Sequence, residues 1–213
     1  MTSGGLPIGG NPAEDLAISR RLDLLAASAR ARGDAVPLDW ILAELHERAF
    51  GLFLLVLALP CCIPFLYGVP QVVALPLMFV AVQLLAGRRT PWLPRRLGAR
   101  TVSAEALENL AGRARPWLRR IETVSRPRLS ALTRAPLDRF AGLALVIFSA
   151  SILVPLPGTN TVPGIAVVIA SVGLLQRDGL LVVLGSILGM VWIATLLLAG
   201  ATLVSLIRPW LGI

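Results

Sequence analysis

Three long apolar runs, joined by polar segments rich in arginine, divide this chain. Residues 49–87, 140–176 and 179–207 contain no charged residue. Prolines and glycines interrupt the first two runs near their middles, whereas the third run has 29 residues and no proline. A helix needs about 20 apolar residues to cross the hydrocarbon layer of a bilayer. The third run therefore predicts one C-terminal transmembrane helix, and the chain is predicted to be an all-α integral membrane protein.

The first interrupted run has two arms that are short for a membrane span. Residues 49–59 and 71–87 flank a segment, residues 60–70, that contains three prolines, Pro64 among them. Proline lacks the N–H group that a helix needs, and backbone groups freed at membrane depth must be buried in protein or line a cavity. We expect a re-entrant helical hairpin that enters and leaves on one side. Two full crossings of a locally thinned bilayer are the alternative.

The second interrupted run repeats this plan. Its arms, residues 140–154 and 164–176, flank a segment from Pro155 to Pro163. We interpret the likeness as an internal repeat of two proline-broken hairpins. The alignment pairs Gly51 with Gly142 and Pro64 with Pro155 and, after a two-residue insertion, Pro70 with Pro163 and Gln83 with Gln176.

The polar segments at residues 1–48 and 88–139 predict amphipathic helices at the membrane surface, because their apolar residues recur at helical spacing. A first helix is predicted from Asn11 and a second from near Pro37. Lipid and the protein's own apolar surface are equally suitable partners for the helix of the central segment. The apolar positions of the three helices are Leu16, Leu22 and Leu25; Leu38, Ile41, Leu42 and Leu45; and Leu107, Leu110, Ala114, Trp117 or Leu118, and Ile121.

The distribution of arginine predicts the orientation of the chain. Residues 1–48 hold five arginines against seven acidic residues, whereas residues 88–139 hold thirteen against four. By the positive-inside rule the N-terminus and residues 88–139 face the cytoplasm, and the C-terminus lies on the other side. Basic residues beside a membrane are held by anionic headgroups, so we expect membrane lipids and not nucleic acid as partners.

The composition excludes a soluble domain and offers little for catalysis. Apolar residues make up 56% of the chain, and the mean hydropathy is +0.78. Cys61 and Cys62 are adjacent in apolar sequence, and His46 is the single histidine. No nucleophile elbow, cluster of metal ligands or glycine-rich phosphate loop is present. We expect no enzymatic activity, no bound metal and no cofactor.

Four arginines stand where the chain leaves or approaches the membrane, and Trp92 follows the first two of them. A guanidinium group matches the oxygens of a phosphate with two parallel hydrogen bonds. These residues are therefore candidates for binding a lipid phosphate, with anchoring by positive charge alone as the alternative. The four arginines are Arg88, Arg89, Arg126 and Arg128.

The second proline-broken segment offers another candidate for anion binding. Asn160 and Thr161 precede Pro163, which marks the start of a helix. Free N–H groups and the positive end of the helix dipole attract an anion at such a start. In the alternative interpretation, these polar side chains only satisfy the backbone of the turn.

Polar residues near the ends of the hairpins complete the candidate set. Arg177 is counted with the phosphate-binding candidates, and its neighbour Asp178 is expected to cap the N-terminus of the last helix. Gln83 and Gln176 are expected to hydrogen-bond across to the other hairpin. The prolines that shape the two breaks are Pro64, Pro155 and Pro163.

Three further motifs are the run from Gln83 to Pro94, the triplet Arg126-Pro127-Arg128, and the set formed by Leu156-Pro157, Asn160, Pro163 and Arg177-Asp178-Gly179. They resemble the motifs of the bacterial exopolysaccharide-synthesis ExoD family. The resemblance extends over roughly residues 35–200. It implies a protein of the bacterial inner membrane that is associated with exopolysaccharide production, without naming a molecular activity.

Three functions follow from these features. In the first, the protein binds or moves a lipid-linked or anionic substrate during polysaccharide export, while the basic segment gathers phosphate and the turn at Asn160 contacts it. In the second, a small transporter or channel for a solute or ion affects polysaccharide indirectly. In the third, a non-transporting scaffold holds the synthesis machinery. We expect a homodimer, because few helices of one chain enclose the hairpin tips.

Overall fold

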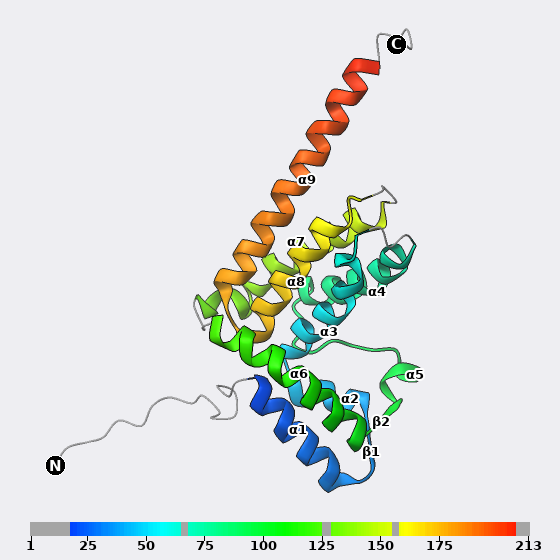
Figure 1. Cartoon of the computed structure of the whole chain (residues 1–213), viewed down its shortest axis with the longest axis vertical. Coiled ribbons are helices and arrows are strands. Elements are labelled where there is room, and N and C mark those ends of the chain that lie inside the picture. Colours follow the sequence, from blue (N-terminus) through cyan, green and yellow to red (C-terminus); the bar gives the residue numbers. More distant parts are fainter. Residues whose placement is uncertain (1–17, 65–67, 125–128, 155–157, 208–213) are drawn as a thin grey trace, which may run out of the picture.

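Helices form almost all of the regular structure in the described part of the chain (Figure 1). The computed structural model describes residues 18–64, 68–124, 129–154 and 158–207. This content confirms the all-α class. In chain order the elements are α1 (Ile18–Arg32), β1 (Ala35–Pro37), α2 (Leu38–Leu45), α3 (Arg48–Ala58), η1 (Leu59–Cys62), α4 (Val69–Leu85), α5 (Arg95–Gly98), β2 (Thr101–Ser103), α6 (Ala104–Val124), η2 (Ser130–Thr133), α7 (Asp138–Leu153), α8 (Thr161–Gln176) and α9 (Gly179–Ile207).

Four helices, α3, α4, α7 and α8, pack around a shared apolar core in the middle of the molecule (Figure 1). Fully buried side chains of this bundle include Phe50, Leu54, Leu77, Leu145 and Phe148. The packing is most extensive between α4 and α7 and between α3 and α8, and it is sparser between the two helices that flank each break. The two arms of one hairpin therefore contact the arms of the other hairpin more extensively than they contact each other.

Two glycines let the backbones of the paired helices touch. A Cβ atom on Gly51 would lie 2.6 Å from Leu175 N, and one on Gly142 would lie 2.5 Å from Leu85 N. The start of α3 thus lies beside the end of α8, and the start of α7 lies beside the end of α4. All four helices have these ends on one side of the bundle, which we call the base.

The two proline-broken segments lie on the opposite side of the bundle, which we call the tips. After α3 the chain continues as the short 3-10 helix η1. A Cβ atom on Gly164, in the first turn of α8, would lie 2.9 Å from Cys61 O in η1. The two breaks are consequently packed against each other at the tips.

Prolines at the tips sit in the first turns of the helices that follow. Helix α8 begins at Thr161, three residues before the predicted arm, and includes Pro163. Proline is tolerated there because the N–H groups of a first turn have no partner within the helix. Helix α4 accommodates Pro70 in the same way. Pro64 lies in an exposed turn, whereas Pro155 is outside the described residues.

Helix α9 begins at the base, runs along the bundle and then projects beyond the tips (Figure 1). Gly185 lies against the backbone of α8, and Gly189 lies against the ring of Phe148. The indole Nε1 of Trp192 donates a hydrogen bond to Thr159 O over 3.2 Å. Because Thr159 belongs to the turn before α8, Trp192 is level with the tips and the rest of α9 extends past them.

Among the described helices, one is long and apolar enough to cross a membrane, namely Gly179–Leu206 in α9. A second would qualify if the bent pair Leu38–Leu45 and Arg48–Cys62 formed one span. Only 17% of the apolar stretch of α9 is buried, unlike the core helix of a soluble protein. The exposed surface of the bundle is also apolar and suits contact with lipid. It includes Val56, Val72, Leu75, Phe79, Phe140, Leu143 and Ile165.

A second layer, made of α1, α2 and α6, lies beyond the base (Figure 1). Leu22 and Leu25 of α1 share a buried cluster with Leu107 and Leu118 of α6. Leu110 of α6, by contrast, is 62% exposed. The described apolar positions of the central amphipathic helix other than Leu110 therefore pack on their own protein, which favours that partner over lipid. The side chains of Ala114, Trp117 and Ile121 are outside the described residues.

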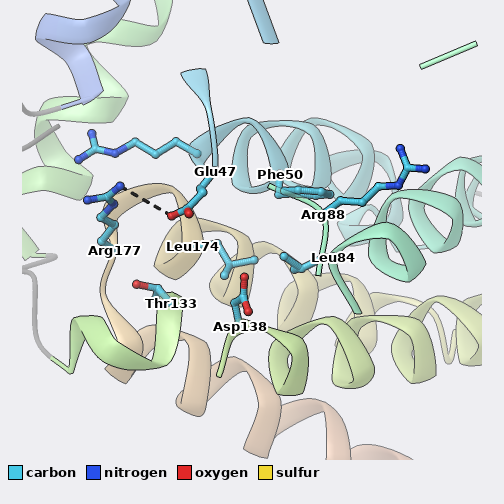
Figure 2. Close-up of a pocket in the computed structure, with 9 residues that line it drawn as sticks. Glu47, Phe50, Leu84, Arg88, Thr133, Asp138, Leu174 and Arg177 are labelled. Atoms are coloured by element: carbon cyan, nitrogen blue, oxygen red, sulfur yellow. Dashed lines mark ion pairs between the residues drawn. The ribbon is translucent and has the colours of Figure 1, made fainter. Parts of the chain in front are cut away.

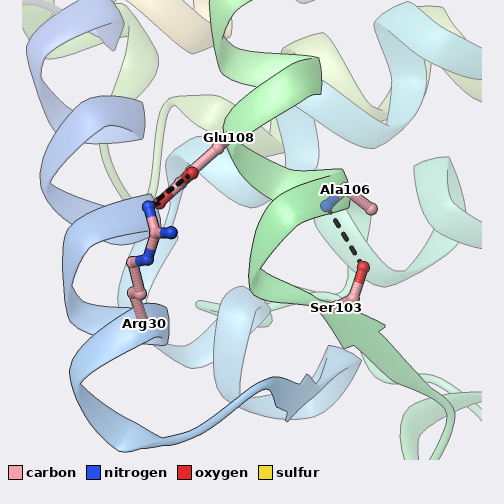
Figure 3. A network of polar contacts seen from close by, with 4 residues as sticks. All are labelled: Arg30, Ser103, Ala106 and Glu108. Atoms are coloured by element: carbon pink, nitrogen blue, oxygen red, sulfur yellow. Dashed lines mark hydrogen bonds and ion pairs between the residues drawn. The ribbon is translucent and has the colours of Figure 1, made fainter.

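Polar contacts hold α6 in place in this layer (Figure 3). Arg30 of α1 forms an ion pair with Glu108 over 2.9 Å. The Ser103 hydroxyl accepts a hydrogen bond from Ala106 N–H over 3.1 Å, which satisfies one of the free N–H groups at the start of α6. The strand β2 that ends at Ser103 pairs antiparallel with β1. The sequence pattern does not predict this small sheet.

The helix predicted near Pro37 is present, and the chain turns sharply after it. Ile41, Leu42 and Leu45 of α2 are buried, as the helical spacing predicts. The axes of α2 and α3 differ by 119°, and the turn between them contains His46 with a φ angle of 52°. The expected helix start at Asn11 is outside the described residues.

Candidate functional site

A narrow cleft opens at the base, where the ends of the four bundle helices meet (Figure 2). The room inside it for water-sized groups is only about 10 Å³, whereas all the empty space around its lining atoms, open solvent included, is about 340 Å³. Both signs of charge line it, above an apolar floor. The lining residues are Glu47, Arg48, Phe50, Leu84, Arg88, Thr133, Asp138, Leu174 and Arg177.

The fold explains why charged groups gather here. Arg48 is the first residue of α3, Asp138 is the first residue of α7, Arg177 follows the end of α8, and Arg88 follows the end of α4. Charged residues flank the apolar runs, and the paired helices bring those flanks to the base. Five ionisable side chains consequently share one cleft, although they come from four separate parts of the sequence.

Arg177 is directed into the cleft by the end of α8. It caps that helix in the left-handed conformation, with a φ angle of 56°. Its guanidinium Nη2 lies 3.8 Å from Oε2 of Glu47, and the two side chains are 13% and 34% exposed (Figure 2). The ion pair is long and partly open to solvent, so water weakens its attraction. The pair therefore contributes little to holding the two side chains in place.

Asp138 supplies a buried carboxylate to the cleft. The residue is 7% exposed, and its Oδ1 accepts no hydrogen bond from the described residues. In Figure 2 the carboxylate points into the space between Leu84 and Leu174. A buried acceptor without a donor is costly, at about 1–3 kcal/mol or more for a charged group. This oxygen is thus available to a donor that enters the cleft.

Arg88 stands at the rim of the cleft. It follows Gly87, which has a φ angle of 77° in the turn that ends α4. The Arg88 N–H donates a hydrogen bond to Gln83 O over 3.1 Å. The Arg88 side chain is exposed, and in Figure 2 its guanidinium is directed away from Asp138. A Cβ atom on Gly87 would meet the guanidinium of Arg139, so a second arginine lies beside the same turn.

The Gln83 amide holds the loop that carries Arg88. Gln83 is 7% exposed; its Oε1 accepts from Trp92 N–H over 2.6 Å, and its Nε2 donates to Trp92 O over 3.2 Å. The expectation that Gln83 hydrogen-bonds across to the other hairpin is therefore wrong, because its amide is bonded to the backbone of Trp92 in the loop that follows α4. The Nε2 of Gln176 is buried and has no hydrogen-bond partner among the described residues.

The remaining arginine-rich candidates do not join the cleft. Arg89 and Trp92 are exposed and are not among its lining residues. The Trp92 ring packs at a tilt on Phe79, with 6.1 Å between ring centroids. Arg126 and Arg128 are outside the described residues. Of the predicted phosphate-binding residues, the structure thus brings Arg88 and Arg177 together.

Asn160 and Thr161 lie at the tips, at the far end of α8 from the cleft. The 16 residues of α8 correspond to about 24 Å of helix. The idea that one bound group contacts both the basic segment and the Asn160 turn is therefore wrong. The Asn160 side chain does not cap α8, and its buried Oδ1 has no partner among the described residues.

Asp178 makes the capping contact that the sequence predicts. Its Oδ1 accepts a hydrogen bond from Leu180 N–H over 3.1 Å, at the start of α9. The side chain is 3% exposed. This bond fixes the turn between α8 and α9 and therefore the position of the neighbouring Arg177.

Sequence reasoning missed four polar residues of the cleft, namely Glu47, Arg48, Thr133 and Asp138. Glu47, Arg48 and Asp138 stand within two residues of an apolar run, as Arg88 and Arg177 do, whereas Thr133 stands seven residues before one. That position was the available signal for Arg48, which directly precedes its run, and for Asp138, which stands two residues before its run. No feature of spacing indicates that these residues face one another, because their contacts join different hairpins.

Comparison with known proteins gives a family match over most of the chain. A family described as "Exopolysaccharide synthesis, ExoD" matches residues 18–198. Protein ExoD of Rhizobium meliloti (strain 1021) is 33% identical over 159 residues, which cover 72% of this chain and 66% of that protein. An uncharacterized protein of Synechocystis sp. (strain ATCC 27184 / PCC 6803 / Kazusa) is 29% identical over 193 residues, or 85% of this chain and 90% of that protein. No solved structure matches the chain.

Proposed function

Because this chain belongs to the ExoD family, whose description is exopolysaccharide synthesis, we propose that it binds an anionic, lipid-linked substrate of that process at the base cleft. It does so in the bacterial inner membrane, with its N-terminus and residues 88–139 in the cytoplasm. It acts by binding and moving the substrate and not by catalysis. The observation that carries this proposal is the gathering of three arginines, Arg48, Arg88 and Arg177, in one cleft.

The level of the cleft supports a lipid headgroup as the ligand. The base joins an apolar bundle, whose exposed side chains suit lipid, to the charged layer of α1, α2 and α6. That junction is where the hydrocarbon of a bilayer gives way to phosphate groups. A phosphate at this depth needs no transfer into the protein core to reach Arg88 at the rim.

The lengths of the helices support re-entrant hairpins. Helix α4 has 17 residues, or about 26 Å, and α8 has 16, or about 24 Å, both short of a hydrocarbon layer of about 30 Å. Helix α9 has 29 residues, or about 44 Å, and starts at the same base. If α9 crosses the bilayer, the tips lie inside it, because they are at the level of Trp192. Both hairpins of the proposed repeat would then end within the membrane.

Polar groups at the tips support a homodimer. The buried Oδ1 of Asn160 and the backbone of the breaks would otherwise lie near lipid, where unsatisfied groups are costly. The projecting half of α9, which includes Leu197, Leu198, Leu203 and Val204, is exposed in one chain. A second copy packed against this half would cover the tips of both chains.

Lipid binding can be measured by native mass spectrometry of the full chain, released from detergent with the lipids that it retains. We expect Arg88→Ala to reduce retained anionic lipid about tenfold, because a charge-assisted hydrogen bond contributes about 1.5–3 kcal/mol. Arg113→Ala is the control, since Arg113 is exposed on α6 away from the cleft. Equal retention in both variants and the wild type would contradict the proposal.

The same preparation separates the other two functions. A protein without retained lipid that carries ions or solutes across liposomes would favour a small transporter. A protein that does neither, but is recovered with polysaccharide synthases from its own membrane, would favour a scaffold. The subunit number in the same spectra tests the homodimer.

A further inference from the structure

The base cleft contains a buried carboxylate, that of Asp138, to which a phosphate alone would not bind. Asp138 is more than nine-tenths buried, it lines the cleft, and its Oδ1 has no hydrogen-bond partner among the described residues. A phosphate brought to this carboxylate would be repelled by it. A ligand that only carried negative charge would therefore leave the buried oxygen without a donor.

The charges that line the cleft lie at two depths, because Arg88 is exposed whereas Arg48 and Asp138 are both buried. Arg88 is exposed at the rim, whereas the Asp138 carboxylate lies among apolar side chains, between Leu84 and Leu174 (Figure 2). Glu47 is the other acidic lining residue, and it is already paired with Arg177. A ligand that satisfies both ends needs an anion at one position and a hydrogen-bond donor a short distance away.

We infer that the cleft selects a headgroup in which a phosphate is joined to a hydroxyl or ammonium group, and that Asp138 is the residue that recognises this donor. The phosphate lies at the rim near Arg88, and its substituent reaches down to the Asp138 oxygen. A sugar joined to lipid through phosphate has this chemistry, as does a glycerol or ethanolamine phospholipid. The inference rests on the proposed function of the cleft and adds the substrate class to it.

Matched lipids test this selection directly. Phosphatidylglycerol and phosphatidylmethanol are both phosphodiesters with one negative charge, but only the first carries hydroxyl groups. Phosphatidylethanolamine and phosphatidylcholine are both zwitterions, but only the first carries N–H donors. Each lipid is titrated into the delipidated full chain in detergent, and bound lipid is counted by native mass spectrometry.

We expect the wild type to prefer the donor-bearing lipid about tenfold in at least one pair, because a hydrogen bond to a charged group contributes about 1.5–3 kcal/mol. A preference in the first pair identifies a hydroxyl, and one in the second identifies an ammonium. Asp138→Asn keeps the shape of the side chain but removes its charge, and should reduce the preference to about twofold. Asp34→Asn makes the same charge change on an exposed residue and should leave the preference unchanged.

Two results would overturn the inference while leaving the proposed function intact. One is equal binding of both lipids in each pair, with binding still lost in Arg88→Ala. The other is a donor preference that persists in a folded Asp138→Asn protein, which would assign recognition to a different group. Binding that is indifferent to Arg88→Ala would instead contradict the proposed function itself.

Discussion

The contact between α4 and α7 at Gly142 gives the most direct test of how the bundle is held together. In Gly142→Ala the new Cβ would lie 2.5 Å from Leu85 N, 2.8 Å from Leu85 Cα and 3.1 Å from Leu84 C. Ordinary contacts of a Cβ atom begin at 3.4 Å. These neighbours are backbone atoms, so no side chain can rotate away, and the two helices must separate by about 1 Å.

The size of the effect follows from two opposing terms. Overpacking a tight interior costs about 1–3 kcal/mol, and the upper end applies because backbone is displaced. Alanine is about 1 kcal/mol more favourable than glycine within a helix. The net loss of unfolding free energy is therefore about 2 kcal/mol. For a chain of this size it lowers the Tm by about 4–8 °C.

Gly112→Ala is the matched control for this substitution. Gly112 lies in α6, and a Cβ there would meet nothing within 4 Å. This variant should gain about 1 kcal/mol from helix propensity alone. Thermal unfolding of the purified protein in detergent, followed by circular dichroism, measures both. A Gly142→Ala protein as stable as Gly112→Ala would refute the close backbone packing of α4 on α7.

Substitutions at two further positions test the contacts that position the cleft. Gln83→Leu should lower the unfolding free energy by about 1–3 kcal/mol, because it leaves the N–H and C=O of Trp92 without their partner. Chemical denaturation measures this loss, and a variant as stable as the wild type would contradict the two hydrogen bonds between Gln83 and Trp92. Asp178→Ala should cost about 1 kcal/mol by removing the cap on Leu180 N–H, whereas Asp178→Asn should retain most of it. Equal losses in the two Asp178 variants would assign the effect to the charge instead of the cap.

Local patterns in the sequence were sufficient for the apolar helices and, to within a few residues, for their ends. The apolar arm predicted at residues 140–154 appears as α7, Asp138–Leu153. The run is apolar throughout, and Pro155 cannot continue a helix, so the helix has to end close to it. The capping role of Asp178 was also readable, since it depends on residues two positions away. Spacing alone could not decide whether α6 packs on lipid or on α1, because both partners present an apolar surface to the same face.

The sequence by itself determined that the chain has three apolar runs, two of them broken by proline, and that charge gathers at their ends. Only the tertiary structure decided that Arg88 and Arg177 share a cleft with Asp138, and that Asn160 lies at the opposite end of the bundle. The reason is that helix pairing depends on close contacts such as that of Gly142 with Leu85. In helices that are apolar on every side, periodicity does not mark which face makes such a contact.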